Sequence, residues 1–369
     1  MMRFNNLARL AIATSLVLGL AGCQSQDQDE AVSLATTEAD AGGNQRFYTA
    51  NIEDGFYDIN RTRGIMVNAA SQANLDGLDR ALYDGTKLEF PTNDYILREG
   101  QAITADEARQ WLAPKSQDND QGLNPEQAAA DKLDSFEPHY LNSIMSYDLL
   151  SEPGQGNDHL AGASVVLALN SQDIFQNESQ TEVVDIDPGV AEEKGKEMAK
   201  EVVRRLRQKE GYQDIPIAVT LYLNGDLTDL AGGVALAQTV SNRGDSLGSW
   251  TNFDQKNYVF GTEELPNQEE QVAFEQFRTE IEALFPRLNG ITGVARYENN
   301  NMVGIDVRIT SQFDGYSEII ALAQKLSSSA TSIFPSNIAI KIEVVSPSGT
   351  SAILARAVDE KAFNYEIIQ

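Results

Sequence analysis

The chain has 369 residues, of which 55 are acidic and 28 are basic, and its net charge at pH 7 is -27. A surface of this sign repels phosphate groups, so the composition excludes nucleic-acid binding and membrane contact through a basic patch. The apolar content of 41% is sufficient for a buried core in one large domain or two smaller ones. The acidity itself suits either a solvated face or a cationic ligand.

Residues 1–22 have the pattern of an export signal. Arg3 and Arg9 precede an apolar run from Leu10 to Cys23, and no acidic residue occurs before Asp27. A basic start, an apolar segment of about 11 residues and small residues at its end are typical of signal peptides. The run is shorter than the roughly 20 apolar residues that a membrane-spanning helix needs. We therefore expect residues 1–22 to be a signal peptide that is removed on export.

The only cysteine of the chain is Cys23, which excludes a disulfide within the chain and a cysteine-ligated metal cluster. It ends a stretch with the lipobox pattern of bacterial lipoproteins, Leu20-Ala21-Gly22-Cys23. In that processing the thiol takes a diacylglyceryl group, and a peptidase then cuts between Gly22 and Cys23. Two acyl chains give a stable anchor, whereas one is marginal. The sequence thus predicts a lipid anchor on Cys23 at the extracellular face of the cell membrane. The membrane and the lipoprotein-processing enzymes are the expected partners, and an ordinary secretory signal with an incidental cysteine is the alternative.

Residues 23–46 are polar, acidic and small, and they show no sustained periodicity. This composition predicts a flexible, disordered tether between the lipid and the folded part. The remainder divides into a first α+β half with an N-terminal helical extension, residues 47–245, and a second α+β half, residues 246–369.

The first half begins with short elements. A strand is expected at residues 65–67, and a helix is expected from an N-cap at Asn74 to a stop at Gly85. Thr104 and Glu107 form a capping-box pattern that opens a helix ending before Pro114. The remaining elements expected are a helical turn at Asn124-Pro125, a helix over 138–150, strands at 161–169 and 182–186, a helix over 188–210 with Asp187 as N-cap and Gly211 as C-terminal cap, and strands at 215–223 and 233–240.

The second half is expected to repeat this order. The pattern predicts a helix over 268–285, strands at 291–298 and 302–310 around an Asn-rich turn, a helix from Gly315 to Pro335, and strands at 338–345 and 351–358. Helix, strand, strand, helix, strand, strand thus occurs over 138–240 and again over 268–358. We expect an α+β fold of two similarly built halves, although this order also arises by coincidence in α+β proteins.

Residues with catalytic or metal-binding chemistry are scarce. The two histidines, His139 and His159, lie 20 residues apart without a metal-binding spacing such as HExxH, so surface positions are favoured over a metal site. Trp111, Trp250 and Tyr258 suit core packing better than a ligand groove. No GxSxG motif or phosphate-binding glycine motif occurs. We therefore assign no catalytic residue, no metal and no cofactor, and we expect a protein that is not an enzyme.

Several short stretches, taken in chain order, carry a resemblance to a known family. They are the lipobox, Gln121–Pro125, Leu167–Ser171, Glu201–Leu206 with Ile215–Ile217, Ser246–Trp250, Asn257–Gly261 and Phe313–Tyr316. In this combination the chain resembles the CamS family of sex-pheromone lipoproteins of Gram-positive bacteria. The resemblance extends from the lipobox almost to the C-terminus.

The resemblance implies that pheromone activity belongs to a peptide cut from the signal, and it supplies no catalytic residue. On this chain the peptide would consist of Ser15, Leu16, Val17, Leu18, Gly19, Leu20, Ala21 and Gly22. Its side chains carry no charge, so it can partition into membranes and fit an apolar receptor pocket that controls conjugation. The alternative is a signal remnant without a receptor. A different hypothesis is a binding module that holds a cell-wall fragment or a peptide in a groove between the two halves.

Overall fold

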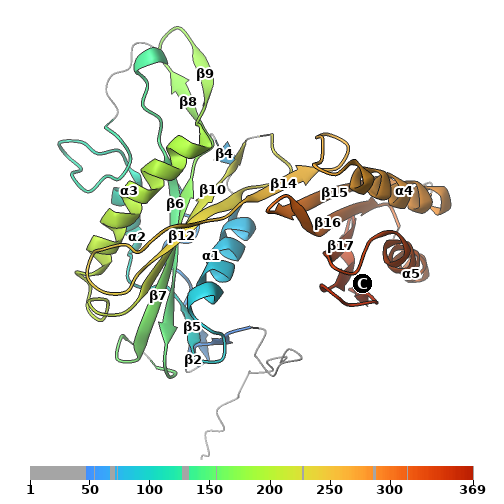
Figure 1. Cartoon of the computed structure of the whole chain (residues 1–369), viewed down its shortest axis with the longest axis horizontal. Helices are drawn as coiled ribbons and strands as arrows, with labels where there is room; N and C mark the ends of the chain where they lie inside the picture. Colours follow the sequence, from blue (N-terminus) through green and yellow to red (C-terminus); the bar gives the residue numbers. More distant parts are fainter. Residues whose placement is uncertain are drawn as a thin grey trace, which may run out of the picture. The chain divides into compact units, whose positions relative to one another are not determined.

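The computed structural model describes residues 47–53, 55–66, 71–72, 74–126, 133–154, 156–226, 228–285, 288–313 and 315–368 (Figure 1). The predicted signal peptide, the lipobox with Cys23, the peptide from Ser15 to Gly22 and the tether lie outside these residues. Among the described residues, no helix has both the length and the apolar character that crossing a membrane requires.

Within the described part of the chain, the first half together with Thr251–Asn252 forms a seven-stranded sheet in the order β1-β5-β6-β7-β10-β12-β13. Its strands are β1 (Thr49–Ala50), β5 (Ile96–Glu99), β6 (Leu141–Leu150), β7 (Leu160–Leu169), β10 (Ile217–Leu223), β12 (Val234–Ser241) and β13 (Thr251–Asn252). Helix α1 (Leu75–Glu89) packs on one face, and helices α2 (Ala105–Leu112) and α3 (Pro188–Leu206) pack on the other. Both faces of this sheet are therefore core.

The prediction of a helix over 138–150 is wrong, because this segment forms β6, a central strand with all ten residues buried. Ile144 faces the core under α3, whereas Met145 and Leu149 face the core under α1. A strand that is buried on both faces carries apolar residues on both, so the alternation that identifies a strand disappears. The apolar residues that remain then match a helical spacing by chance.

Smaller boundary errors have local causes. Helix α1 continues through Gly85 to Glu89, and α3 ends at Leu206, before Gly211. Ile65 and Met66 form no strand, and Asn124 forms an isolated bridge with Pro114 where we expected a helical turn. Val67 lies outside the described residues.

The predicted N-caps are confirmed, whereas Gly211 does not cap α3, whose C-cap is Arg207. Asn74 Oδ1 accepts the Gly77 N–H at 3.0 Å, and Asp187 Oδ1 accepts the N–H groups of Gly189 and Val190 at 2.9 and 3.1 Å. Thr104 and Glu107 form the complete capping box of α2. These residues satisfy N–H groups that have no partner within the helix, which is why their positions can be read from sequence.

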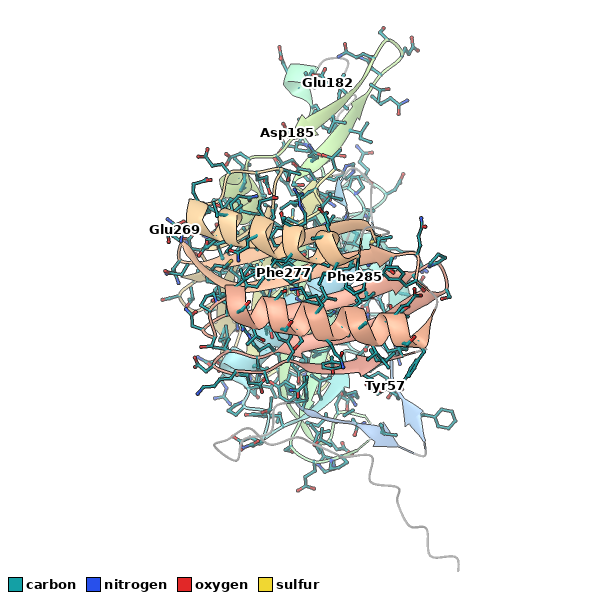
Figure 2. The ribbon with its side chains drawn as sticks, turned by 90° about the vertical axis from the view of Figure 1, so that its right-hand side faces the viewer. Tyr57, Glu182, Asp185, Glu269, Phe277 and Phe285 are labelled. Atoms are coloured by element: carbon teal, nitrogen blue, oxygen red, sulfur yellow. The ribbon has the colours of Figure 1, made fainter. Side chains whose placement is uncertain are left out.

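Within the described residues, the second half forms a six-stranded sheet in the order β14-β15-β16-β17-β18-β19. Its strands are β14 (Gln255–Val259), β15 (Leu288–Glu298), β16 (Asn301–Ser311), β17 (Ala339–Ser346), β18 (Gly349–Arg356) and β19 (Asn364–Ile367). Helices α4 (Gln268–Leu284) and α5 (Tyr316–Ile333) lie side by side on one face, with Phe277 between helix and sheet (Figure 2). Asn299 and Asn300 have φ of +50° and +62°, which confirms the predicted Asn-rich turn.

Short elements complete the description. They are β2 (Ile52–Glu53) with β3 (Phe56–Tyr57), β4 (Ser71–Gln72) with β11 (Gly225–Asp226), the hairpin of β8 (Gln172–Gln176) and β9 (Thr181–Asp185), and a 3-10 turn at Leu133–Ser135.

The two halves share one connectivity. In the first, α1-β6-β7-α3-β10-β12 contains antiparallel, parallel and antiparallel pairs in turn. In the second, α4-β15-β16-α5-β17-β18 has the same sequence of pairs. The predicted α+β fold with two similarly built halves is confirmed, but the first copy begins at α1, because β5 and α2 are inserted before β6. The boundary at residue 245 stays a prediction.

The halves differ in where the first helix packs. Helices α1 and α3 cover opposite faces of the first sheet, whereas α4 and α5 cover the same face of the second. The second sheet therefore keeps one face that none of its own helices covers, and this face supplies one wall of the site described below.

A buried ion pair fixes β5 against β6. The side chains of Arg98 and Asp148 are only 3% and 1% exposed, and Arg98 Nη2 lies 2.7 Å from Asp148 Oδ2. Tyr212 donates its hydroxyl to Asp148 Oδ1 at 2.5 Å. A charge in such a position depends on its partner, because no water can replace it.

We expect Arg98→Met to lower the free energy of unfolding by about 3–5 kcal/mol, since it leaves the Asp148 carboxylate buried without its counter-ion. Urea unfolding followed by circular dichroism measures the change. The double variant Arg98→Met/Asp148→Leu should recover most of the loss, and a double variant as unstable as the single one would contradict this explanation.

A second prediction concerns the contact between α3 and α2. Glu201 accepts hydrogen bonds from Arg204 and Arg205, which hold its pKa down at about 2, and Arg205 also lies over the Trp111 ring. A carboxylate with a lowered pKa stabilises the fold above its unfolded pKa of about 4.3, and this contribution is lost as the pH falls toward 2.

Glu201→Gln should therefore lower the free energy of unfolding by up to about 1 kcal/mol at pH 7, a small value because the carboxylate is partly exposed. The loss should become smaller as the pH falls from 5 toward 2. Thermal unfolding across that range tests it, with the more exposed Glu197→Gln as the control. An equal cost for Glu201→Gln at pH 7 and pH 3 would refute the assignment.

Candidate functional site

The site begins with one side of helix α1. Asp76, Arg80, Asp84 and Leu88 recur every four residues, so they form a single row along the helix. The opposite side carries Leu78 and Leu82, which are buried against the first sheet. The packing of α1 therefore directs this row, which we call the α1 row, away from the first sheet.

Two glycines bring α1 close to the sheet. A Cβ atom at Gly85 would lie 2.4 Å from Thr220 Oγ1, and one at Gly77 would lie 2.5 Å from the Tyr222 hydroxyl. Both distances are shorter than a Cβ contact allows, so a side chain at either position would displace the tyrosine or threonine hydroxyl or the helix. Gly85, which the sequence suggested as a helix stop, is in fact a point of close approach in the middle of the helix.

The uncovered face of the second sheet forms the other wall. Along β15, the buried residues Ile291, Ala295 and Tyr297 alternate with Thr292, Arg296 and Glu298. The neighbouring strands continue the polar side with Asp306, Arg308, Lys341 and Glu343. This alternation is expected for a strand that has core on one side and solvent on the other.

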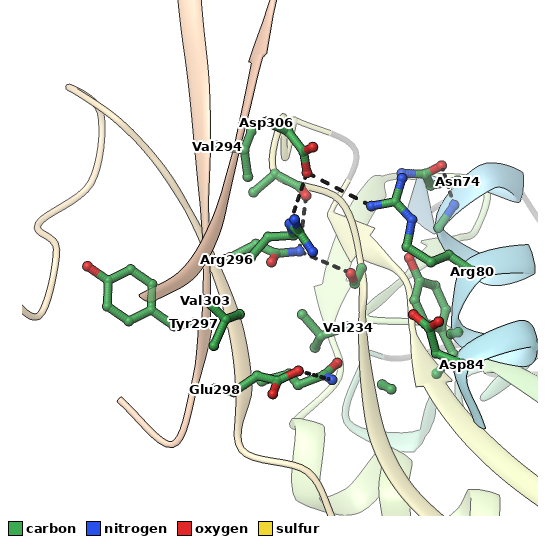
Figure 3. Close-up of a pocket in the computed structure, with 18 of the residues that line it drawn as sticks. Asn74, Arg80, Asp84, Val234, Val294, Arg296, Tyr297, Glu298, Val303 and Asp306 are labelled. Atoms are coloured by element: carbon green, nitrogen blue, oxygen red, sulfur yellow. Dashed lines mark hydrogen bonds and ion pairs between the residues drawn. The ribbon is translucent and has the colours of Figure 1, made fainter. Parts of the chain in front are cut away.

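Between these walls lies a cavity of about 900 Å³ (Figure 3). The α1 row and the polar face of the second sheet line it, together with Tyr222 of β10 and Val234 of β12. The amide of Asn257 on β14 joins the second sheet to the loop before β12, because its Nδ2 donates to the carbonyl oxygens of Ala231 and Gly233 at 3.2 and 3.3 Å. A cavity of this volume accommodates a ligand of small-molecule size.

Charged groups are paired along part of the cavity. Asp306 Oδ2 lies 3.0 Å from Arg296 Nε and 3.9 Å from Arg80 Nη1, so it links the second sheet to α1 (Figure 3). Arg308 and Glu343 form another pair at 3.3 Å. These pairs fix the side chains that shape the wall.

Asp84 differs from these acids. Its side chain opens into the cavity, yet it forms no hydrogen bond or ion pair with another described residue. Burial by the surrounding protein raises its pKa, Lys87 and Arg80 act in the opposite direction, and Glu298 adds to the rise. The Asp84 side chain is exposed toward the cavity, so its carboxylate is accessible to a bound cation.

The floor of the cavity contains a buried hydroxyl. Thr220 is fully buried, and its Oγ1 has no hydrogen-bond partner in the described part of the chain. The adjacent Tyr222 hydroxyl has its pKa raised to about 12 by burial, partly offset by the Gly233 backbone. Buried polar atoms without partners are uncommon in native proteins and suggest a bound water or ligand group.

The histidines do not form a site together. His139 precedes β6, where its Nδ1 lies 2.9 Å from Asp173 Oδ2, and His159 lies beyond the other end of that strand. Ten residues of β-strand separate them by about 30 Å. Among the described residues, no cluster of three histidine, cysteine or acidic side chains could hold a metal ion.

The aromatic residues considered from the sequence pack as expected. Trp111 is buried between α2 and α3, and Trp250 packs against the same core. Tyr258 makes an edge contact with Tyr297, with ring centroids 5.1 Å apart. The prediction that they serve packing is confirmed.

Comparison with known proteins identifies the family. The model of the CamS sex pheromone cAM373 precursor matches residues 57–362. The chain belongs to this CamS family. None of the curated protein sequences matches it.

Two solved CamS-type structures are similar. The sex pheromone precursor of Lactobacillus salivarius subsp. salivarius UCC118 is 29% identical, with a TM-score of 0.79 over 88% of this chain and 96% of that one. The C-terminal domain of the sex pheromone staph-cAM373 precursor from Staphylococcus aureus is 20% identical, with a TM-score of 0.69 over 80% of this chain and 96% of that one, and it supports the fold alone. The family resemblance read from the sequence is thus confirmed.

The sequence analysis missed the α1 row and the polar face of the second sheet. Both left a signal, since charged residues at every fourth position of a helix and at alternate positions of a strand indicate faces outside the core. What the sequence did not show is that these two faces lie opposite each other.

The glycine contact gives a test of the site's geometry. We expect Gly85→Ala to cost about 1–3 kcal/mol of stability, since its Cβ would displace Thr220 or α1. The variant Gly85→Ala/Thr220→Ala should recover part of that loss, because it removes the clashing hydroxyl. Thermal unfolding measures both, and a double variant that recovers nothing would show that Thr220 is not the limiting contact.

Proposed function

We propose that the protein is a lipid-anchored extracytoplasmic lipoprotein and a sex-pheromone precursor, with the lipid on Cys23 and the pheromone released from its signal peptide. Membership of the CamS family, together with a lipobox at the only cysteine, is the observation that carries this proposal. The cut between Gly22 and Cys23 would then give two products. One is the folded domain on the extracellular face of the cell membrane, and the other is the signal that contains Ser15 to Gly22.

The anchor is tested with Cys23→Ala. Without the thiol no diacylglyceryl group can be attached, so we expect loss of fatty-acid labelling and either release of the protein to the medium or persistence of the unprocessed chain. Metabolic labelling with a palmitate analogue, followed by fractionation, measures this. Substitution of a tether residue, Ser25→Ala, is the control and should change neither. Unchanged labelling of Cys23→Ala would overturn the assignment.

The pheromone activity of the peptide is tested separately. A synthetic peptide with the sequence of residues 15–22 should induce clumping or raise conjugation frequency in a responsive donor strain, whereas a scrambled peptide of the same composition should not. If no strain in a panel of donors responds to the peptide, the pheromone proposal is wrong, whereas the lipid-anchor proposal is unaffected.

A second function is favoured by the cavity between the α1 row and the second sheet. The folded domain would be a binding module that holds a cell-wall fragment or a peptide there. Tyr222, Val234 and Val294 line the cavity beside its charged groups, and a mixed apolar and polar lining is typical of ligand sites.

Thr292→Trp tests this second function. Thr292 is exposed on β15 and lines the cavity, and tryptophan is well tolerated in strands, so the change should obstruct part of the cavity without unfolding the sheet. A digest of cell walls should raise the melting temperature of the parent protein and leave that of Thr292→Trp unchanged. A digest that shifts neither protein, or both equally, would count against binding in the cavity.

A further inference from the structure

One end of the cavity is acidic, although the charges of Lys87, Arg80 and Arg296 partly offset the rise in the pKa of Asp84 there. At this end Asp84 of α1 faces the second sheet, where Glu298 is close enough to raise its pKa. Glu298 accepts one hydrogen bond from Gln255, at 3.0 Å, whereas Asp84 has no hydrogen bond or ion pair with another described residue. Two carboxylates that face one space, one of them without a partner, are a favourable environment for a cation.

Apolar side chains flank this acidic end. Leu88, one turn beyond Asp84, is 67% exposed, and Leu230 is 73% exposed, and both line the cavity. Large apolar residues left this open beside a charged pocket indicate a contact surface. A bare metal ion would not use them, so the cation they fit is the ammonium group of an organic molecule.

Basic groups with free donors lie farther along the cavity. The Arg80 side chain is 53% exposed, and its contact with Asp306 is long, at 3.9 Å, so most of its N–H donors are available. Lys341 is exposed and stands beside Asp306 in the register of β16 and β17. Together they can bind a carboxylate, for which guanidinium groups are well suited.

The register gives the spacing of the two ends. Asp306 pairs with Val294 on β15, and Val294 is four residues from Glu298. The acidic and basic ends are therefore separated by about 13 Å along the strand direction. An extended peptide of about four residues spans this distance.

Amide side chains at the two ends of the cavity suit a peptide backbone. Asn74, Asn252 and Gln255 all line the cavity, and each amide can both donate and accept. A peptide backbone, with alternating N–H and C=O groups, can satisfy groups of this kind.

We propose that the cavity binds a short peptide with free ends, whose ammonium group lies between Asp84 and Glu298 and whose carboxylate is bound by Arg80 and Lys341. This inference rests on the second function proposed above, since it names the ligand class of the same cavity. Recognition is by the two charged ends and the main chain, so peptides of different sequence but similar length should bind.

Calorimetric titration of the full chain, purified in detergent, tests the proposal. The probes are tetra-alanine, N-acetyl-tetra-alanine and tetra-alanine amide. Either cap removes one charge, so each capped peptide should bind about tenfold more weakly or worse. Equal affinity for the free and the N-acetylated peptide would overturn the proposal.

Variants identify the residues. Asp84→Asn should weaken tetra-alanine about tenfold and leave the N-acetylated peptide unaffected, because the partner charge is already missing. Glu89→Gln is the matched control, since Glu89 is an exposed acid on the same helix that does not line the cavity. Equal effects of the two substitutions would exclude Asp84 from the site.

The outcomes separate this inference from the function on which it rests. If tetra-alanine does not bind but a cell-wall digest stabilises the parent protein and not Thr292→Trp, the peptide class is wrong and the binding function stands. If neither tetra-alanine nor the digest distinguishes the parent from Thr292→Trp, both proposals fall.

Discussion

The close packing of α1 on the first sheet is the contact on which the rest of the site depends. Gly77 and Gly85 remove the two side chains that would hold the helix away, and Leu78 and Leu82 then reach the core. A helix fixed in this way exposes its opposite side in one orientation. Asp84 and the rest of the α1 row therefore project into the cavity as a consequence of packing on the far side of the same helix.

The two halves show how one connectivity can produce different surfaces. Both contain helix, strand, strand, helix, strand, strand with the same pattern of strand pairing. In the second half both helices cover one face, so the other face must be polar, and Arg296, Glu298 and Asp306 are located there. The first half has core on both faces and cannot provide such a wall. The difference lies in the position of one helix.

Local chemistry explains what could be predicted from the sequence. Asn74, Thr104 and Asp187 satisfy N–H groups of the helices they open, and Asn299 and Asn300 suit the positive φ of their turn. These effects act within a few residues, so they are visible without the fold. The class of fold and the family could also be read from the sequence, because they depend on the order of elements and on collinear stretches.

Features that depend on distant residues could not be read in this way. Segment 138–150 is a strand because both of its faces are covered, and nothing within it records that. A glycine such as Gly85 is typical of a helix end, but in the structure it lies within the helix and packs against Thr220. Only the position of Thr220 distinguishes these two roles. The same holds for Asp84, whose significance comes from the second sheet, where Glu298 follows it by more than two hundred residues.

The contact of Arg80 with Asp306 has a consequence for the order of folding. It closes a loop that contains more than half of the chain, and contacts of such long range form late because the entropy of loop closure opposes them. Each half can reach its own core before the cavity exists. The cavity is thus a feature of the finished molecule alone, and occupancy of it would report that a newly exported chain has completed folding.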